Sequence, residues 1–242
     1  MFRFLTTNQT EAVELRGEIV ACDKMSKRAV IETASGKIEF TFMFTDAESV
    51  GILADSLIGY PVEGSPVRNK NLVLLKGDKV RFGRNKTRYT IHSIEKLDSF
   101  DSLYCIEEFR QLKDNWDGEG TFAPKKESLD WLEKFFLNYP KHLKPPAQFM
   151  NEDGKTIDME WDEEDSPLVI CLDVHLDSHK AEGFTYYSDT PKTSKLAWSI
   201  RGSRNISYDF DNPEDVVKLF ELIGEYGQEL NEREDLVVAS SS

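Results

Sequence analysis

Cysteine is scarce in this sequence of 242 residues, and the three that occur stand far apart, at Cys22, Cys105 and Cys171. An odd number of isolated cysteines, none in a CxxC pair, argues against a disulfide framework. We therefore expect reduced thiols in a cytoplasmic protein. We interpret all three as small residues of the core.

Long apolar runs are also missing, and so are the common catalytic motifs. No stretch approaches the roughly 20 apolar residues of a membrane span. The first five residues are followed by a polar run, so we expect no signal-peptide core. There is no G-x-S-x-G, Walker A or H-E-x-x-H sequence. The sequence therefore favours a non-catalytic protein, and it predicts no cofactor and no membrane partner.

Positive charge is lacking in the second part of the chain. Residues 1–98 contain 15 Lys and Arg against 13 Asp and Glu, whereas residues 99–242 contain 15 against 31. Such an imbalance predicts two modules with different surfaces, 1–98 and 99–242. The length is sufficient for two small domains.

The first module is rich in short strand patterns. They cover residues 12–22, 28–33, 37–44, 72–75, 79–82 and 88–94, and Asp46 can cap a helix that runs to about residue 56. Three strands, a helix and further strands is the order of an OB-type barrel. Another small barrel of five or six strands is equally compatible with this pattern.

Basic residues concentrate between Arg68 and Arg88, with one acid, Asp78, among them. Cations that follow phosphates and aromatics that stack bases are typical of single-stranded nucleic-acid binding. The candidate residues for that function are Arg81, Phe82, Arg84, Lys86, Arg88 and Tyr89. Two alternatives remain open: a solvated edge hairpin protected by its charges, and a hairpin that docks on the acidic second module of this chain or on another protein.

The second module begins with two helical patterns, residues 102–112 and 125–138, and continues with strand patterns. The strands are expected at 147–150, 156–161, 168–176, 184–187 and 196–200, with one more possible at 205–210 and a helix from about residue 212. The expected fold class is therefore α+β, with a small N-terminal barrel followed by a helix-covered antiparallel sheet.

The stretch NWDGEG, residues 115–120, separates the two helical patterns. Its glycines permit positive φ, and an indole on a tight turn usually fills the junction between helices. In the alternative interpretation, Trp116, Asp117 and Glu119 form a recognition knob for a protein partner. The stretch fits neither an EF-hand nor a dinucleotide loop, because required ligands and a third glycine are absent.

This NWDGEG-x-x-AP motif, followed by a helix and by the DG-x-x-x-x-x-EW stretch at residues 153–161, resembles a group of uncharacterised bacterial and phage proteins. Members carry an NWDG-x-G-A-x-x-P motif ahead of a small antiparallel sheet. The resemblance covers residues 103–200 and implies a fold, but it implies no activity. Thr121 and Phe122 depart from the tighter spacing of the group.

The residues most compatible with a metal site are Asp173, His175 and Asp177. If the strand continued to His179, its two-residue period would place all four acid and histidine side chains on one face. Imidazole and carboxylate suit zinc or manganese, so a metal-dependent enzyme is one alternative function. The simpler interpretation is a polar, solvated strand face.

Together these patterns favour an interaction protein over an enzyme. We expect a bacterial or phage protein that binds a protein partner in the manner of an antitoxin or immunity subunit. Single-stranded nucleic-acid binding through the basic hairpin is the second hypothesis. An acidic surface that occupies a basic cleft on a partner is consistent with the first.

Overall fold

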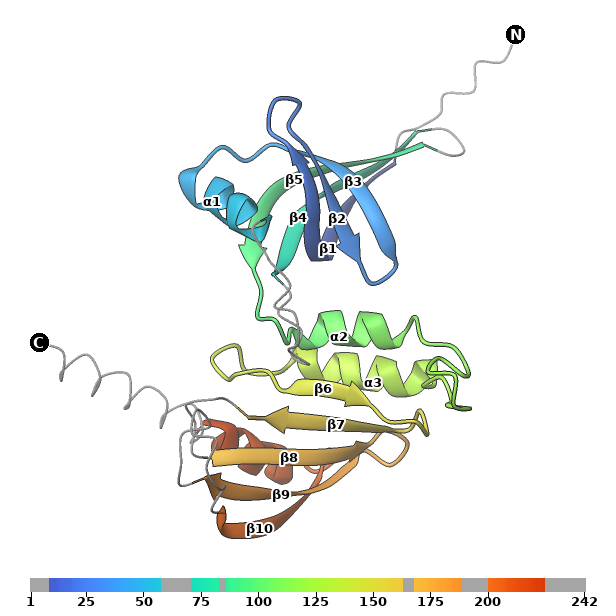
Figure 1. Ribbon diagram of the computed structural model, residues 1–242, viewed down its shortest axis with the longest axis vertical. Coiled ribbons are helices and arrows are strands. Elements are labelled where there is room, and N and C mark those ends of the chain that lie inside the picture. Colours follow the sequence, from blue (N-terminus) through green and yellow to red (C-terminus); the bar gives the residue numbers. More distant parts are fainter. Residues whose placement is uncertain (1–8, 58–70, 83–85, 163–167, 189–199, 225–242) are drawn as a thin grey trace, which may run out of the picture. The chain divides into compact units, whose positions relative to one another are not determined.

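The computed structural model describes residues 9–57, 71–82, 86–162, 168–188 and 200–224. The chain divides into two compact units, Met1–Glu108 and Phe109–Ser242. The division falls within α2 (Ser102–Phe109), whereas the composition of the sequence placed the limit of the first module after residue 98. One unit contains a closed β-barrel and the other an antiparallel sheet with helices, which confirms the predicted α+β fold class (Figure 1).

The barrel has the strand order β1-β2-β3-β5-β4. Its elements are β1 (Gln9–Asp23), β2 (Arg28–Thr33), β3 (Gly36–Phe42), α1 (Ala47–Ser56), β4 (Leu72–Phe82) and β5 (Lys86–Lys96). Only the β3–β5 pair is parallel among the described pairs, and the helix stands between β3 and β4. This is the order of an OB-type barrel, one of the two predicted alternatives.

Local sequence signals place several of these elements. The carboxylate of Asp46 accepts a hydrogen bond from the Ser49 N–H at 2.7 Å, so Asp46 caps α1 as predicted. The patterns at 72–75 and 79–82, expected to be two strands, are one strand. The connecting residues 76–78 stay paired with both β1 and β5, so tertiary pairing continues the strand through Gly77.

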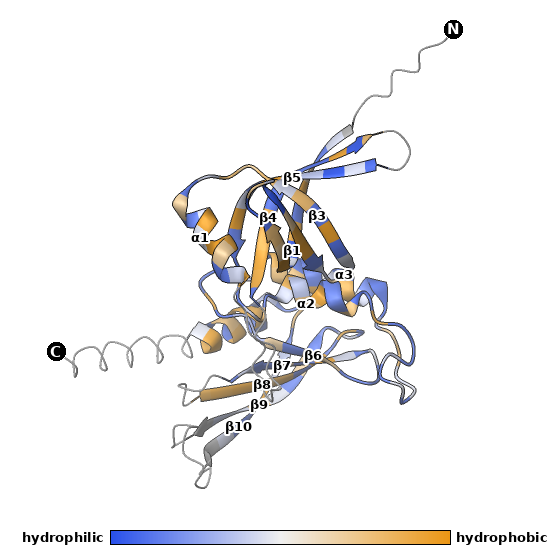
Figure 2. Cartoon of the chain, turned by 45° about the horizontal axis from the view of Figure 1, so that its top comes forward, coloured by the Kyte–Doolittle hydropathy of each residue, from blue (hydrophilic) through white to orange (hydrophobic). Residues whose placement is uncertain are grey.

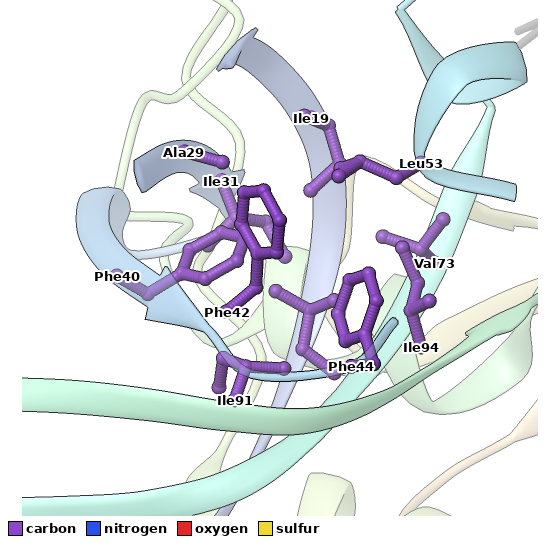
Figure 3. Close-up of a cluster of buried hydrophobic side chains, with 11 residues drawn as sticks. Ile19, Ala29, Ile31, Phe40, Phe42, Phe44, Leu53, Val73, Ile91 and Ile94 are labelled. Atoms are coloured by element: carbon purple, nitrogen blue, oxygen red, sulfur yellow. The ribbon is translucent and has the colours of Figure 1, made fainter. Parts of the chain in front are cut away.

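The core of the barrel is aromatic and aliphatic (Figure 3). Phe40, Phe42 and Phe44 point into it from β3 and the residues that follow, with the rings of Phe42 and Phe44 stacked at 5.2 Å. Ile31 and Ile91 are fully buried beside them. Because these side chains alternate with exposed ones along β2 and β3, the period of two seen in the sequence determines which face is inside.

The second unit is built on a five-stranded sheet of order β10-β9-β8-β7-β6, and every neighbouring pair is antiparallel. The strands are β6 (Ala147–Met150), β7 (Thr156–Trp161), β8 (Leu168–His175), β9 (Lys180–Ser188) and β10 (Ile200–Asp209). A helix follows at 213–224. The predicted strand at 196–200 falls largely outside the described residues.

Helices cover one face of this sheet. On this face the buried side chains of β7 and β8 include Ile157, Met159, Trp161, Ile170, Leu172 and Val174. In α3 (Lys126–Leu137), Trp131 packs edge-on against Phe210, and Phe135 contacts both Phe210 and Phe220 of the following helix. The opposite face, which we call the open face, exposes Asp173, Glu182 and Phe184, although Thr156 and Val169 on the same face are buried.

Candidate functional site

The NWDGEG loop, residues 115–120, is fixed by its own hydrogen bonds. Asn115 adopts a φ of 62°, its N–H donates to the Thr121 carbonyl at 2.7 Å, and its side-chain oxygen accepts from the Gly120 N–H at 2.8 Å. The carboxylate of Asp117 accepts from the Glu119 N–H and from the Thr121 hydroxyl, both at 2.8 Å. These bonds, above all that from the Glu119 N–H, lower the pKa of Asp117.

The loop is also held against the β6–β7 turn, which is distant in sequence. The Phe122 N–H donates to the Glu152 carbonyl at 3.0 Å. In the turn, Gly154 has a φ of 63° and lies so close to the Phe122 carbonyl that a Cβ at this position would overlap it. Any residue with a Cβ is therefore disfavoured at position 154 for two reasons: the left-handed backbone conformation and the lack of space.

This rigid loop presents aromatic and acidic side chains to solvent. Trp116 is 39% exposed and Phe122 is 63% exposed. Trp116 thus leaves more than a third of its accessible surface open, although the sequence favoured a buried plug at a helix junction. Sequence reasoning singled out Trp116, Asp117 and Glu119, and the structure adds Phe122 and Glu152. Contacts across 30 residues of sequence, among them the hydrogen bond from the Phe122 N–H, bring Glu152 to the loop.

Three carboxylates meet at this place. Ligand atoms of Asp117, Glu119 and Glu152 lie within 4.8 Å of one another, and all three residues are exposed. Within the described ranges, no other group of three such side chains converges in this way. Oxygen donors of this kind attract a hard cation or a cationic side chain of a partner. The arrangement concentrates negative charge beside two exposed aromatic rings.

The predicted metal residues Asp173, His175 and Asp177 do not come together. β8 ends at His175, so the two-residue period stops before Asp177. Asp177 instead pairs with Lys125 at 3.0 Å and lies 3.4 Å from the Ser128 hydroxyl, close to the beginning of α3. His179 stacks on Trp131 with ring centroids 4.2 Å apart, so this histidine belongs to the helix packing.

The predicted nucleic-acid residues lie on an arm, which we define as the paired ends of β4 and β5, residues 79–82 and 86–89. The arm extends beyond the barrel and has largely hydrophilic colours in Figure 2. Strand register divides its side chains between two faces: Lys79, Arg81 and Tyr89 on one, and Phe82, Lys86 and Arg88 on the other. Arg84 lies outside the described residues.

Each face of the arm combines one aromatic ring with two cations. The Lys79 ammonium stands 5.9 Å from the Tyr89 ring centroid, and the Arg88 guanidinium stands 5.6 Å from that of Phe82. Phe82, Lys86 and Arg88 also line a surface hollow. Among the described residues, no carboxylate pairs with the four cations of the arm: Lys79, Arg81, Lys86 and Arg88.

The outer face of β2 and β3 differs sharply from the arm. Its outward positions hold cross-strand ion pairs, Arg28–Glu39 at 3.7 Å and Lys37–Glu32 at 3.8 Å. OB-type barrels commonly bind oligonucleotides on this face. Here its cations are already neutralised, and its aromatic residues Phe40 and Phe42 point inward. A nucleic-acid function would therefore depend on the arm.

Comparison with known proteins adds no further constraint. No protein-family model matches this chain, and no curated protein matches it. In the part of the chain that the structure describes, none of the helices has the length and apolar character needed to cross a membrane.

Proposed function

We propose that this chain is an interaction protein that binds a protein partner through the NWDGEG loop and its neighbours Phe122 and Glu152. The observation that carries the proposal is a contrast within the loop. Its backbone is fixed by hydrogen bonds to itself and to the β6–β7 turn, yet Trp116 and Phe122 remain exposed. Large aromatic side chains are usually buried, so their exposure on a rigid loop is informative.

Rigidity favours binding because little conformational entropy is lost when a partner docks. Immobilising one rotamer-rich side chain at an interface costs about 0.5–1.5 kcal/mol. A loop that is already ordered avoids much of this cost. Trp is also among the residues most enriched at energetic hot spots, where truncation to Ala costs about 2 kcal/mol or more. Trp116 is accordingly the expected anchor of the interface.

The carboxylates indicate the charge of the partner. Asp117, Glu119 and Glu152 gather beside the exposed residues of the loop, and none of the three pairs with a lysine or arginine among the described residues. Complementary charge raises association rates and disfavours acidic partners. The proposed partner surface is therefore basic at its rim and apolar at its centre. The chain would act on this partner in the manner of a bacterial or phage antitoxin or immunity subunit in the cytoplasm.

Site-specific photocrosslinking tests this function. A photoreactive amino acid replaces Trp116, Phe122 or, as a control, Leu137, which is 64% exposed at the end of α3. In cells of the native host, the loop positions should give one shared, discrete product that the control position does not. The identified partner is then purified, and Trp116→Ala should weaken its binding at least tenfold while Leu137→Ala does not. Equal crosslinking at all three positions would contradict the proposal.

A second candidate function, single-stranded nucleic-acid binding, is supported by the four cations of the arm, which pair with no carboxylate among the described residues. Four cations that neutralise four phosphates predict a slope of log affinity against log salt of about −2.8 for a single strand. The affinity should therefore fall about 50-fold between 50 and 200 mM salt. Two aromatic faces would supply stacking of about 1–3 kcal/mol per base.

A labelled 20-nucleotide oligo(dT) in an anisotropy titration measures this slope. The double variant Lys86→Gln/Arg88→Gln should reduce the slope to about −1.4, because two phosphate contacts are lost. The matched control, Arg28→Gln/Lys37→Gln, removes the same charge from the ion-paired face of β2 and β3. An equal reduction in both double variants would assign the binding to overall charge and reject a role of the arm.

A further inference from the structure

The open face of the second sheet carries a row of carboxylates that crosses three strands. Asp158 of β7 stands directly opposite Asp173 of β8, which stands directly opposite Glu182 of β9. Like charges in directly opposed cross-strand positions destabilise a sheet. No lysine or arginine pairs with these three residues within the described part of the chain. The isolated sheet therefore bears an electrostatic cost that a cationic partner would remove.

Aromatic rings frame this row. Phe149 of the edge strand β6 pairs with Asp158 and is 50% exposed. Phe184 of β9 is 43% exposed and stacks on Tyr186 at 6.0 Å. The rings come from β6 and β9 and the carboxylates from β7, β8 and β9, so the sheet itself fixes their spacing. The face thus combines exposed rings, at which an apolar or guanidinium group can pack, with carboxylates whose mutual repulsion a cation would relieve. One of them, Asp158, also accepts a hydrogen bond from the Asn151 amide at 2.8 Å.

The spacing of the row matches a helix laid across the strands. Adjacent strands lie about 4.8 Å apart, so the three carboxylates span about 9.6 Å. An α-helix advances about 10.5 Å over seven residues, and its residues i, i+4 and i+7 share one face. Arginine at these three positions would place one guanidinium over each carboxylate, which suits the paired hydrogen bonds of an arginine–carboxylate contact.

We propose that the open sheet face of Phe149, Asp158, Asp173, Glu182, Phe184 and Tyr186 is a docking site for an arginine-bearing helix of another polypeptide. This site is separate from the NWDGEG loop and does not depend on the function proposed for that loop. The occupant is chosen by charge complementarity. The face carries one lysine, Lys180, but its row of three carboxylates pairs with no described lysine or arginine, so it selects a basic helix over an acidic or purely apolar one.

The probe is a labelled alanine-based helical peptide with arginines at i, i+4 and i+7, titrated against the full chain at 150 mM salt. Its control is a peptide of the same composition with the arginines distributed around the helix. The patterned peptide should bind at least tenfold more tightly than this control. Equal affinities would reduce the interaction to general attraction by an acidic protein, and absence of binding by the patterned peptide would overturn the proposal.

Variants of the chain locate the site. The double variant Asp173→Asn/Glu182→Gln should lower the affinity of the chain for the patterned peptide at least tenfold. Phe184→Ala should lower this affinity severalfold. The charge-matched control is Glu127→Gln/Glu221→Gln, at two exposed helical positions, with an expected change below twofold. Trp116→Ala should leave the affinity unchanged, which separates this site from the loop. If these carboxylates instead bound Ca²⁺ or Mn²⁺ and no peptide, the face would be a metal site and the proposal would be wrong.

Discussion

Gly154→Ala offers the sharpest test of how the NWDGEG loop is held in place. At a φ of 63°, the left-handed conformation costs an L-residue with a Cβ about 1–2 kcal/mol. The new Cβ would also overlap the Phe122 carbonyl and approach that of Ala123 at 3.0 Å. Relief of the overlap requires the loop to move away from the turn, which breaks the Phe122 to Glu152 hydrogen bond.

The expected loss of stability follows from these two contributions. A typical intramolecular hydrogen bond is worth about 1 kcal/mol, so Gly154→Ala should lower the free energy of unfolding by about 2–3 kcal/mol. Gly118→Ala is the matched control. Its φ of 86° carries a similar conformational cost, but a Cβ there meets no atom within 4 Å, so the expected loss is about 1–2 kcal/mol.

Urea denaturation followed by tryptophan fluorescence measures both losses. Gly154→Ala should shift the midpoint further than Gly118→Ala, with the same dependence on urea concentration. It should also weaken partner binding by the loop, since Phe122 moves with it. If the two variants lost the same stability, the contact between loop and turn would contribute nothing, and the argument for a preorganised binding loop would lose its basis.

Three further predictions concern the barrel core and the open sheet face. Phe40→Ala should lower the stability of the barrel by about 3–5 kcal/mol in urea denaturation, whereas Val20→Ala, on the outer surface, should change it little. Burial, and then the neighbouring Asp173, raise the pKa of Asp158 above its ordinary 3.8, so its ionisation opposes folding at pH 7 but not at pH 3. Asp158→Asn should therefore raise the melting temperature at pH 7 and leave it unchanged at pH 3, and a decrease at pH 7 would contradict the carboxylate-row argument. Burial, together with Glu160 and Asp173, raises the pKa of the Cys171 thiol to about 11. With roughly 100-fold less thiolate than a thiol at the ordinary pKa of 9.0, Cys171 should react with iodoacetamide far more slowly than free cysteine at pH 7.5.

Local sequence signals predicted the elements of the fold well. The strands at residues 28–33, 147–150 and 156–161 have the expected bounds, because alternation of apolar and polar residues reports directly which side is buried. Asp46 caps its helix because a short acidic side chain satisfies the free N–H groups of the first turn. These features depend on neighbours within a few residues, which a sequence displays.

The ends of elements were predicted less well where distant contacts decide them. β8 stops at His175, although the alternating pattern continues to His179. The reason is that both side chains contact α3. Asp177 pairs with Lys125 at the beginning of this helix, and His179 stacks on Trp131 within it. Neither contact is visible from spacing along the chain.

The sequence by itself determined the separation into a balanced and an acidic part, the elements of each, and the residue types available for binding. Only the tertiary structure decided which of them meet. Barrel closure and strand register placed the cations of the arm on two faces, and a hydrogen bond brought Glu152 beside Asp117 and Glu119. The register of β7, β8 and β9 aligned three carboxylates in one row. Composition and periodicity are local properties of a chain, whereas register and closure depend on packing between segments far apart in sequence.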